Sequence, residues 1–553
     1  MAISNGSSEY PFMNEPPKIK PHGLVSYFLG GNRPLDEVTH RSPENGLDRN
    51  LKSVFDRKPN QKLWDGIYYW VNDGSVNIKE FTPISPKAQR AMRAAARFWD
   101  SVMCIPFQEV SGSEALKNVE WWRGDHGHEH HHPGHHFLFS QHLPVREAAH
   151  ATIGWLHTVD ADLHLPPNLM HLGDEASPMT VIHEFGHTLG MLHMQMRGDR
   201  DEYIHVDFAA IDIAHYHLPN EKNANFNHKW TQDRYAEFPY EFGSTMHYSA
   251  AAFAKHGAET MNPLPKFEVY HDTMGHGLPT LYDIMSVHRH YGCHTVCPEK
   301  YAPDQLPKCE NGGINNPRNC RGDCICPVGF APPLCKMAVT QCGRAIEVDH
   351  HRRSFQLAYP KFRDIFDDER ASGGSIYIRH EERRTCTYFL RAPPGSRIKV
   401  TIEGLEFHKF RDDCGRGCRN CGLEFKLISD HRYTGATFCQ KSNVGRELVS
   451  EGHILPIIVY NTIGGVIGRI AYELTNDPPT LTMADLPGST PTYSHQEEAP
   501  TLRELDPYHP INYKDPIDEQ SWPELRETYL NTGNYNSPLA TLIFCAMFIY
   551  QLL

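Results

Sequence analysis

The sequence has little cysteine in its first half and no concentrated run of basic residues. Only Cys104 precedes position 293, whereas thirteen cysteines lie between Cys293 and Cys439, and the last one is Cys545. The formal net charge of −13 and the lack of a basic run exclude a nucleic-acid-binding surface. The dense cysteines of the second half indicate disulfide bonds that formed in an oxidising compartment.

The N-terminus lacks the basic start and the long apolar run of a secretory signal. This lack conflicts with the compartment that the cysteines indicate. We give the cysteines more weight, because a first exon can be truncated or mispredicted, whereas an ordered disulfide framework cannot arise from such an error. The protein is therefore expected to be secreted or anchored at the cell surface.

Residues 1–60 show no sustained hydrophobic periodicity and are rich in proline, glycine and asparagine, which predicts a flexible or propeptide-like segment. A strand is expected over residues 67–71, where a domain begins. Ser85 and Pro86 predict the start of a helix over 87–102. Its inward stripe is Ala88, Met92, Ala95, Trp99 and Val102. A second strand is expected to begin at residue 104, and the whole chain is long enough for several domains, each with its own core.

Residues 183–193 carry the pattern of a catalytic metal site. On a helix, His183 and His187 lie one turn apart on the same face, so both imidazoles can bind one ion. Gly190 stands where helices commonly end in a left-handed conformation, which lets the chain turn and bring His193 to the same ion. Three histidines leave the fourth position of zinc open for water, and Glu184 can accept a proton from that water.

This eleven-residue pattern, followed by a later methionine turn, is the signature of the metzincins. The alternative is a histidine-rich helix with a structural role, which a lone His-x-x-x-His would favour. The joint presence of Glu184, Gly190 and His193 favours a zinc site instead.

Residues 244–248 supply a methionine turn, in which Met246 can pack beneath the three histidines. With this turn and with residues 195–203, the sequence resembles the astacin family of metallopeptidases. The resemblance implies one catalytic Zn²⁺ ion, and it implies that Tyr248 is a displaceable zinc ligand that stabilises the oxyanion. It also implies an α+β metzincin-type catalytic domain, with a twisted sheet and two long helices above the zinc cleft and an irregular part below.

The sequence departs from the astacin pattern in three places. Residues 28–31 have glycine where the family's propeptide has a zinc-binding aspartate. Met194 replaces the glutamate that receives the mature N-terminus, so activation through that contact is expected to be lost or rerouted. The resemblance pairs Cys104 with Cys293, but no cysteine lies between them to form the family's second disulfide.

Seven histidines crowd an eleven-residue stretch ahead of the zinc helix, namely His126, His128, His130, His131, His132, His135 and His136. A second metal site or a pH sensor is one interpretation of this cluster. We favour the other, an exposed insertion that binds metals adventitiously.

Residues 295–337 hold six cysteines in a pattern that resembles an EGF-like module. The resemblance implies three pairs: Cys297 with Cys320, Cys309 with Cys324, and Cys326 with Cys335. So small a unit needs disulfides in place of a large core. Residues 321–323 form an Arg-Gly-Asp tripeptide, which integrins bind, although these residue types also suit an ordinary exposed turn.

Short alternating strands recur over residues 340–475 and predict an all-β domain. Examples are residues 375–379, 397–402, 424–428 and 454–460. Together with four cysteines, this region resembles a CUB domain, a β-sandwich that usually recognises proteins; the four are Cys342, Cys386, Cys414 and Cys439. Cys418 and Cys421 are an extra pair, for which a bridge to each other is one option. The acidic residues that bind calcium in many CUB domains are not evident, and no calcium is predicted.

Residues 476–537 are rich in proline, threonine and acidic residues and predict a disordered stalk. Residues 538–553 are almost wholly apolar and suit the removed tail of a GPI signal, through which the protein would be anchored to a membrane. Candidate attachment residues are Asn531, Gly533 and Ser537. A short terminal helix or a gene-model artefact is the alternative.

These observations predict an extracellular zinc endopeptidase whose catalytic domain spans residues 61–294. Its expected partners are protein or peptide substrates, and matrix or cell-surface proteins bound through the EGF-like and CUB-like modules. The rival interpretation is an adhesion or binding protein whose peptidase domain has become a scaffold. The missing disulfide, Met194 and the histidine-rich insertion favour this rival. The intact Glu184 and the three histidines speak against it.

Overall fold

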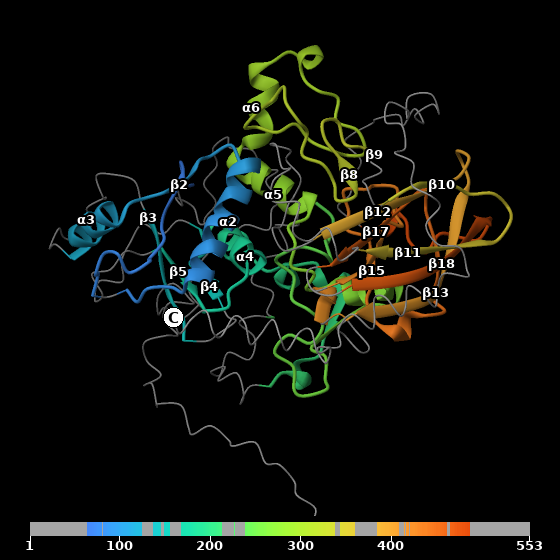
Figure 1. The fold of residues 1–553 in the computed structure, drawn as a ribbon, viewed down its shortest axis with the longest axis horizontal. Helices are drawn as coiled ribbons and strands as arrows, with labels where there is room; N and C mark the ends of the chain where they lie inside the picture. Colours follow the sequence, from blue (N-terminus) through green and yellow to red (C-terminus); the bar gives the residue numbers. More distant parts are fainter. Residues whose placement is uncertain are drawn as a thin grey trace, which may run out of the picture.

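The computed structural model describes residues 63–486, except for 80, 124–136, 145–148, 155–167, 213–225, 227–237, 338–342, 360–383, 409–413, 415, 420 and 462–464. The propeptide-like segment, the histidine cluster, Cys342, the strand predicted over 375–379 and the apolar tail lie outside the described residues. Figure 1 shows a small sheet with helices, a disulfide-rich part beyond α6, and a β-sandwich.

A five-stranded sheet with the order β2-β1-β3-β5-β4 forms the first layer. Its strands are parallel except for the edge strand β4, which pairs with β5 in the antiparallel sense. Side chains alternate along β1, so that Ile67 and Tyr69 face α2 and α4, whereas Trp70 packs on the opposite face. The strands are β1 (Ile67–Trp70), β2 (Phe107–Glu109), β3 (Phe137–His142), β4 (Ala149–Ala151) and β5 (Leu169–Leu172).

Two helices cover one face of this sheet, α2 (Pro86–Val102) and α4 (Pro178–Thr188), while α3 (Gly112–Arg123) lies beyond its other face. Ser85 caps α2 through the N–H of Ala88 (3.1 Å), which confirms the predicted start of this helix. All five residues of its predicted inward stripe are buried. The next strand begins at Phe107, three residues later than predicted.

Below α4 the chain is irregular and leads to a pair of helices. Short strands and 3₁₀ turns follow, and α5 ends at Gly292, which adopts the left-handed conformation (φ 73°). Because α6 continues through residue 295, the predicted boundary at 294/295 falls inside a helix. These elements are η1 (Met194–Met196), η2 (Arg200–Glu202), β6 (Ile204–Val206), η3 (Phe208–Ala210), β7 (Met261–Pro263), η4 (Pro265–Thr273), α5 (Leu281–Tyr291) and α6 (Cys293–Lys300).

Disulfide bonds join distant parts of the chain. Cys104 is bonded to Cys293 across 189 residues. The disulfide-rich part contains η5 (Pro303–Gln305), β8 (Phe330–Ala331) and β9 (Lys336–Met337). Its bonds are the three pairs that the resemblance implied: Cys297 with Cys320, Cys309 with Cys324, and Cys326 with Cys335.

The option of a bridge between Cys418 and Cys421 is wrong. The structure bonds Cys414 to Cys421 and Cys418 to Cys439. Gly417 (φ 65°) and Cys418 (φ 49°) reverse the chain in the left-handed region. This turn brings Cys414 back to Cys421 and directs Cys418 towards Cys439.

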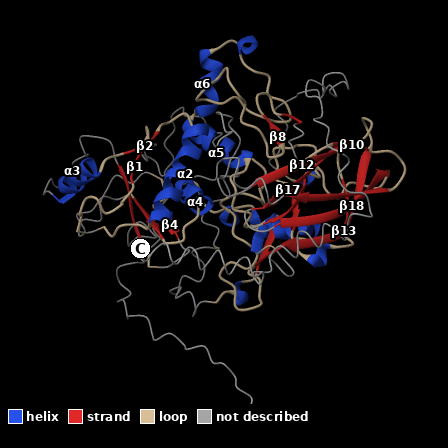
Figure 2. Ribbon diagram, in the orientation of Figure 1, coloured by secondary structure: helices blue, strands red, loops and turns tan. Residues whose placement is uncertain are grey.

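The remaining strands form a sandwich of two sheets, with strand orders β10-β12-β17-β14-β15 and β11-β18-β13-β16 (Figure 2). Apolar side chains from both sheets, such as Phe425, Ile457 and Val400, meet in its core. The predicted strand at 397–402 extends to His408, and the one at 424–428 instead covers 421–425. The strands are β10 (Ala345–Glu347), β11 (Arg353–Tyr359), β12 (Arg384–Arg391), β13 (Arg397–His408), β14 (Cys421–Phe425), β15 (Ala436–Phe438), β16 (Glu447–Val449), β17 (Ile454–Asn461) and β18 (Gly465–Thr475).

The sandwich does not bury its core separately from the region below α4. One continuous cluster of buried residues includes Tyr203, Phe242 and Tyr270 of that region together with Phe425 and Ile457 of the sandwich. The buried cores of these two regions are therefore continuous. Among the described residues, no helix combines the length and apolarity that crossing a bilayer requires.

Candidate active site

Three histidines converge at the end of α4. His183 and His187 lie one turn apart on this helix, which begins behind its cap Ser177. Gly190 follows with φ 102°, a conformation that glycine adopts without strain, and the chain turns back so that His193 faces the other two. The structure thus brings together the three residues that the sequence predicted as metal ligands.

The tautomers of two of these histidines follow from their partners. His183 Nδ1 lies 2.7 Å from the carbonyl oxygen of Thr245, and His187 Nδ1 lies 2.9 Å from that of Met191. A carbonyl oxygen only accepts, so each Nδ1 carries the proton and donates it. The Nε2 atoms are consequently left as acceptors, as in histidines that bind a metal.

The spacing of the acceptor nitrogens fits one zinc ion. His193 Nε2 lies 3.1 Å from His187 Nε2 and 3.2 Å from His183 Nε2. A tetrahedral zinc ion with Zn–N distances of about 2.0–2.1 Å needs nitrogens about 3.3 Å apart. Lone pairs that face one another so closely repel, and a cation between them removes the repulsion.

Burial keeps the imidazoles neutral. It lowers the pKa of His183 to about 4 and that of His187 to about 3. Neutral imidazole is the form that binds metals. Among the described residues, the other grouping of metal-ligand types is Asp272 with Cys418 and Cys439, but its sulfurs form a disulfide and are not available to an ion.

Glu184 is a buried carboxylate at the same site. It is 4% exposed, and burial raises its pKa to about 8 against the opposing hydrogen bond from the backbone of Ala151 in β4. Its Oε2 atom is buried without a hydrogen-bond partner in the described structure. An unpartnered buried oxygen beside three acceptor nitrogens is suited to binding a water molecule at the metal.

The methionine turn packs directly under α4. Met246 is fully buried, and its sulfur lies 3.0 Å from the position that a Cβ atom on Gly186 would occupy. Any larger residue at position 186 would therefore displace Met246. Met194, next to the third histidine, is buried, and its N–H donates to the carbonyl oxygen of Met246 (3.0 Å).

Tyr248 follows the methionine turn and lies beside the third ligand. Its ring centroid is 4.3 Å from that of His193. Burial, with the nearby Glu184 carboxylate, raises the pKa of its hydroxyl well above the usual value, so Tyr248 is a neutral hydrogen-bond donor.

Asp283 is a supporting residue that the sequence interpretation missed. Its carboxylate accepts hydrogen bonds from the hydroxyl of Ser244 (2.6 Å) and the N–H of Thr245 (2.9 Å), and so holds the methionine turn. It also forms a capping box with Thr280 at the start of α5. The Thr-x-x-Asp pattern ahead of an apolar run was a sequence signal for the cap, but not for the contact with the turn.

Comparisons with known proteins find two matching family models and several similar proteins. Residues 166–292 match the model of the astacin peptidase family, and residues 75–205 match that of Matrixin. The chain is similar to the high choriolytic enzyme 1 of Oryzias latipes, a hatching enzyme zinc-protease, with 18% identity over 42% of this chain and 94% of that one and a TM-score of 0.29.

Several zinc metalloproteinases of Caenorhabditis elegans are similar in sequence. The chain is 25% identical to nas-31 over 76% of its own length, 28% identical to nas-25 over 77%, and 32% identical to nas-32 over 47%. These matches cover 57%, 92% and 35% of the three relatives. The chain thus spans just over half the length of nas-31.

Proposed function

We propose that this chain, whose residues 166–292 match the model of the astacin peptidase family, is a zinc-dependent endopeptidase that hydrolyses peptide bonds in extracellular proteins. The observation that carries the proposal is the cluster of three inward-facing imidazole nitrogens beside a buried carboxylate with an unpartnered oxygen. The domain assignment over residues 61–294 belongs to the same proposal.

His183, His187 and His193 hold the ion, which, when bound, polarises a water molecule and the scissile carbonyl. Glu184, which follows His183 on α4, accepts the proton of the attacking water. The burial that raises its pKa makes Glu184 a stronger base towards that water, and the leaving amine then takes up the proton. Tyr248 donates a hydrogen bond to the oxyanion of the tetrahedral intermediate.

The edge strand β4 offers a binding site for an extended substrate. It pairs with β5 on one side, and the described residues place no strand on its other side. Its last residue, Ala151, reaches Glu184 through the backbone. A peptide that adds to this edge as a further strand would be held by main-chain hydrogen bonds with its scissile bond near the histidines.

The downstream regions are proposed to act as recognition modules. Residues 295–337 form an EGF-like module and residues 340–475 a CUB-like sandwich, and both would contact matrix or cell-surface proteins. The disulfide bonds suit an oxidising, extracellular compartment. Residues 476–537 would be a stalk, and residues 538–553 the tail of a GPI signal.

The test is hydrolysis of casein by the purified full chain, with bound zinc measured on the same sample. One zinc per chain and cleavage that a chelator abolishes are the expected results. A folded chain that binds zinc but cleaves nothing, with every mature N-terminus tried, would favour the adhesion scaffold.

A further inference from the structure

A loop of the sandwich, residues 430–435, is held in one conformation by buried charges; we name it the wedge. The ammonium group of Lys426 donates hydrogen bonds to the carbonyl oxygens of His431 (2.9 Å) and Tyr433 (2.8 Å). The carboxylate of Glu424 accepts from the N–H of Gly435 (2.8 Å). Lys426 and Glu424 are both almost fully buried, so the wedge depends on polar contacts that water does not replace.

The wedge contacts the segment that leads into the methionine turn. The hydroxyl of Tyr433 donates to the carbonyl oxygen of Tyr240, and the N–H of Thr434 donates to the carboxylate of Glu241 (3.2 Å). Glu241 is 1% exposed and also accepts from the N–H of Gly243 (3.0 Å). One carboxylate therefore links a loop of the sandwich to the segment that precedes the turn.

The two segments fit together without spare space. A Cβ atom on Gly243 would lie 2.5 Å from Cγ2 and 2.6 Å from Cβ of Thr434, so only glycine is accommodated there. Gly243 is followed by Ser244 and Thr245, and the carbonyl oxygen of Thr245 holds the ring of His183. A short covalent path from Gly243 to Thr245 thus connects the wedge to a metal ligand.

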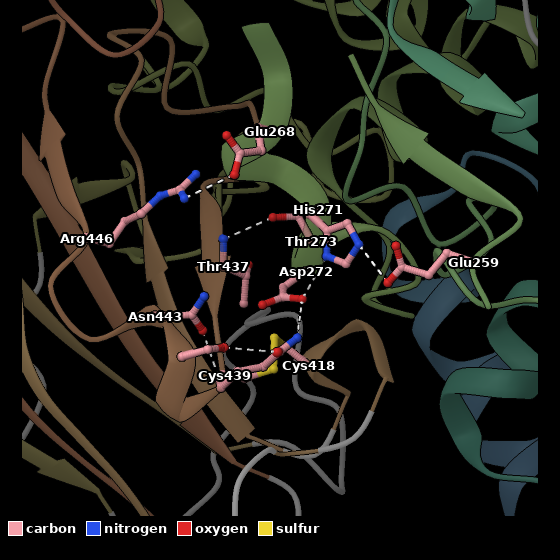
Figure 3. Close-up of polar contacts among 12 residues, drawn as sticks. Glu259, Glu268, His271, Asp272, Thr273, Cys418, Thr437, Cys439, Asn443 and Arg446 are labelled. Carbon is pink, nitrogen blue, oxygen red and sulfur yellow. Dashed lines mark hydrogen bonds and ion pairs between the residues drawn. A yellow bond between two sulfur atoms is a disulfide. The ribbon is translucent and has the colours of Figure 1, made fainter. Parts of the chain in front are cut away.

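Figure 3 shows that the contact continues along η4. The hydroxyl of Thr273 accepts from the N–H of Thr437 (2.9 Å). Arg446 pairs with Glu268 at 3.2 Å, and Lys266 pairs with Asp485 at 2.6 Å. The wedge is therefore one part of a larger interface, and this interface includes shared apolar core.

We propose that the wedge is a positioning element of the active site, so that zinc affinity and turnover depend on the β-sandwich. The proposal rests on the function proposed above. It makes Glu241, Tyr433 and Thr434 positioning residues that act through the methionine turn. The sandwich would then be part of the peptidase rather than only a recognition module.

The test places a methyl group in the contact and then makes room for it from the other side. Gly243→Ala in the full chain should lower zinc affinity, measured by chelator competition, about tenfold, because overpacking a tight contact shifts one partner. It should lower kcat to a similar degree and leave KM nearly unchanged. Gly243→Ala/Thr434→Gly should restore zinc affinity and kcat to within about twofold of the parent, with Thr434→Gly alone completing the cycle.

A second pair of variants covers the case in which Gly243→Ala does not fold. Tyr433→Phe removes one hydroxyl of the wedge and should lower zinc affinity about two- to fivefold. Tyr472→Phe, in the other sheet of the sandwich, is the matched control and should change nothing. A folded Gly243→Ala or Tyr433→Phe chain with the parent's zinc affinity and kcat, or a Gly243→Ala defect that Thr434→Gly leaves in place, would overturn the proposal. A parent chain that binds no zinc would instead overturn the proposed function itself.

Discussion

The sheet region that precedes the histidines in the chain and the region that follows them differ in which residues make up their buried apolar cores. The sheet region, made of β1–β5 with α2 and α4, buries an apolar cluster to which no described residue of the sandwich belongs. The lower region, residues 192–282, contributes to a cluster that continues through the sandwich. The disulfide-rich part adds Ile325 to the core of the sheet region.

The difference shows that a domain boundary inferred from the sequence need not separate two apolar cores. The lower region has short strands and 3₁₀ turns, which alone provide few apolar faces that could cover one another. Side chains of the sandwich, such as Tyr433 and Phe425, complete the apolar core of the lower region. The three histidines of the candidate site lie where the two regions meet, so contacts from both regions hold them.

The largest predicted effect is the loss of peptide hydrolysis when Glu184, on α4 of the sheet region, is replaced. Glu184→Gln should lower peptide hydrolysis by about 10²–10⁴-fold, because the general base is lost, while bound zinc remains near one per chain. Casein cleavage and metal content measure the two properties. Glu120→Gln, on the exposed side of α3, is the control. Rates equal to the parent would show that Glu184 is not the base.

The shared core should be visible in a matched pair of cavity variants. Phe425→Ala in the sandwich should lower the free energy of unfolding by about 3–5 kcal/mol and increase hydrogen exchange in η4. Met92→Ala in the sheet region should cost about 2–5 kcal/mol and increase exchange in α2 and β1 instead. Both residues are fully buried. If Phe425→Ala left exchange in η4 unchanged, the lower region would have a core of its own.

Removal of the long disulfide should lower the free energy of unfolding more than removal of a short one. Replacing Cys104 and Cys293 by serine removes a constraint across 189 residues, which corresponds to about 5 kcal/mol in the chain-entropy model. Replacing Cys326 and Cys335 opens a loop of 9 residues and should cost about 3 kcal/mol. Denaturant unfolding of the two variants measures the difference. Equal losses would mean that local strain, not loop length, dominates.

The smallest effect concerns the pH dependence of the interface at η4. Hydrogen bonding to Asp272, with the nearby charge of Glu259, raises the pKa of His271 to about 9 from its usual value of 6.5. Protonated His271 therefore stabilises the folded chain. This stabilisation is fully present below pH 6.5 and is lost as the pH rises through about 9. The melting temperature of the parent should therefore fall over this range more than that of His271→Gln. His256→Gln, at an exposed histidine, should behave like the parent.

Local patterns predicted much of the site region. The helix over 87–102 and the left-handed Gly190 follow from capping and from the conformational freedom of glycine, which act over a few residues. The same is true of the one-turn spacing of His183 and His187. Strand ends were predicted less well, because the ends of β2 and β14 depend on their partner strands.

The sequence by itself determined which residues can bind one ion, because a helix turn and a glycine bend place side chains by local geometry alone. Only the tertiary structure decided how that group is supported. The contacts of Asp283 with the methionine turn, of Thr434 with Glu241, and of Cys418 with Cys439 join segments that lie far apart in the chain. Such pairs depend on how the segments pack, and no spacing in the sequence encodes them.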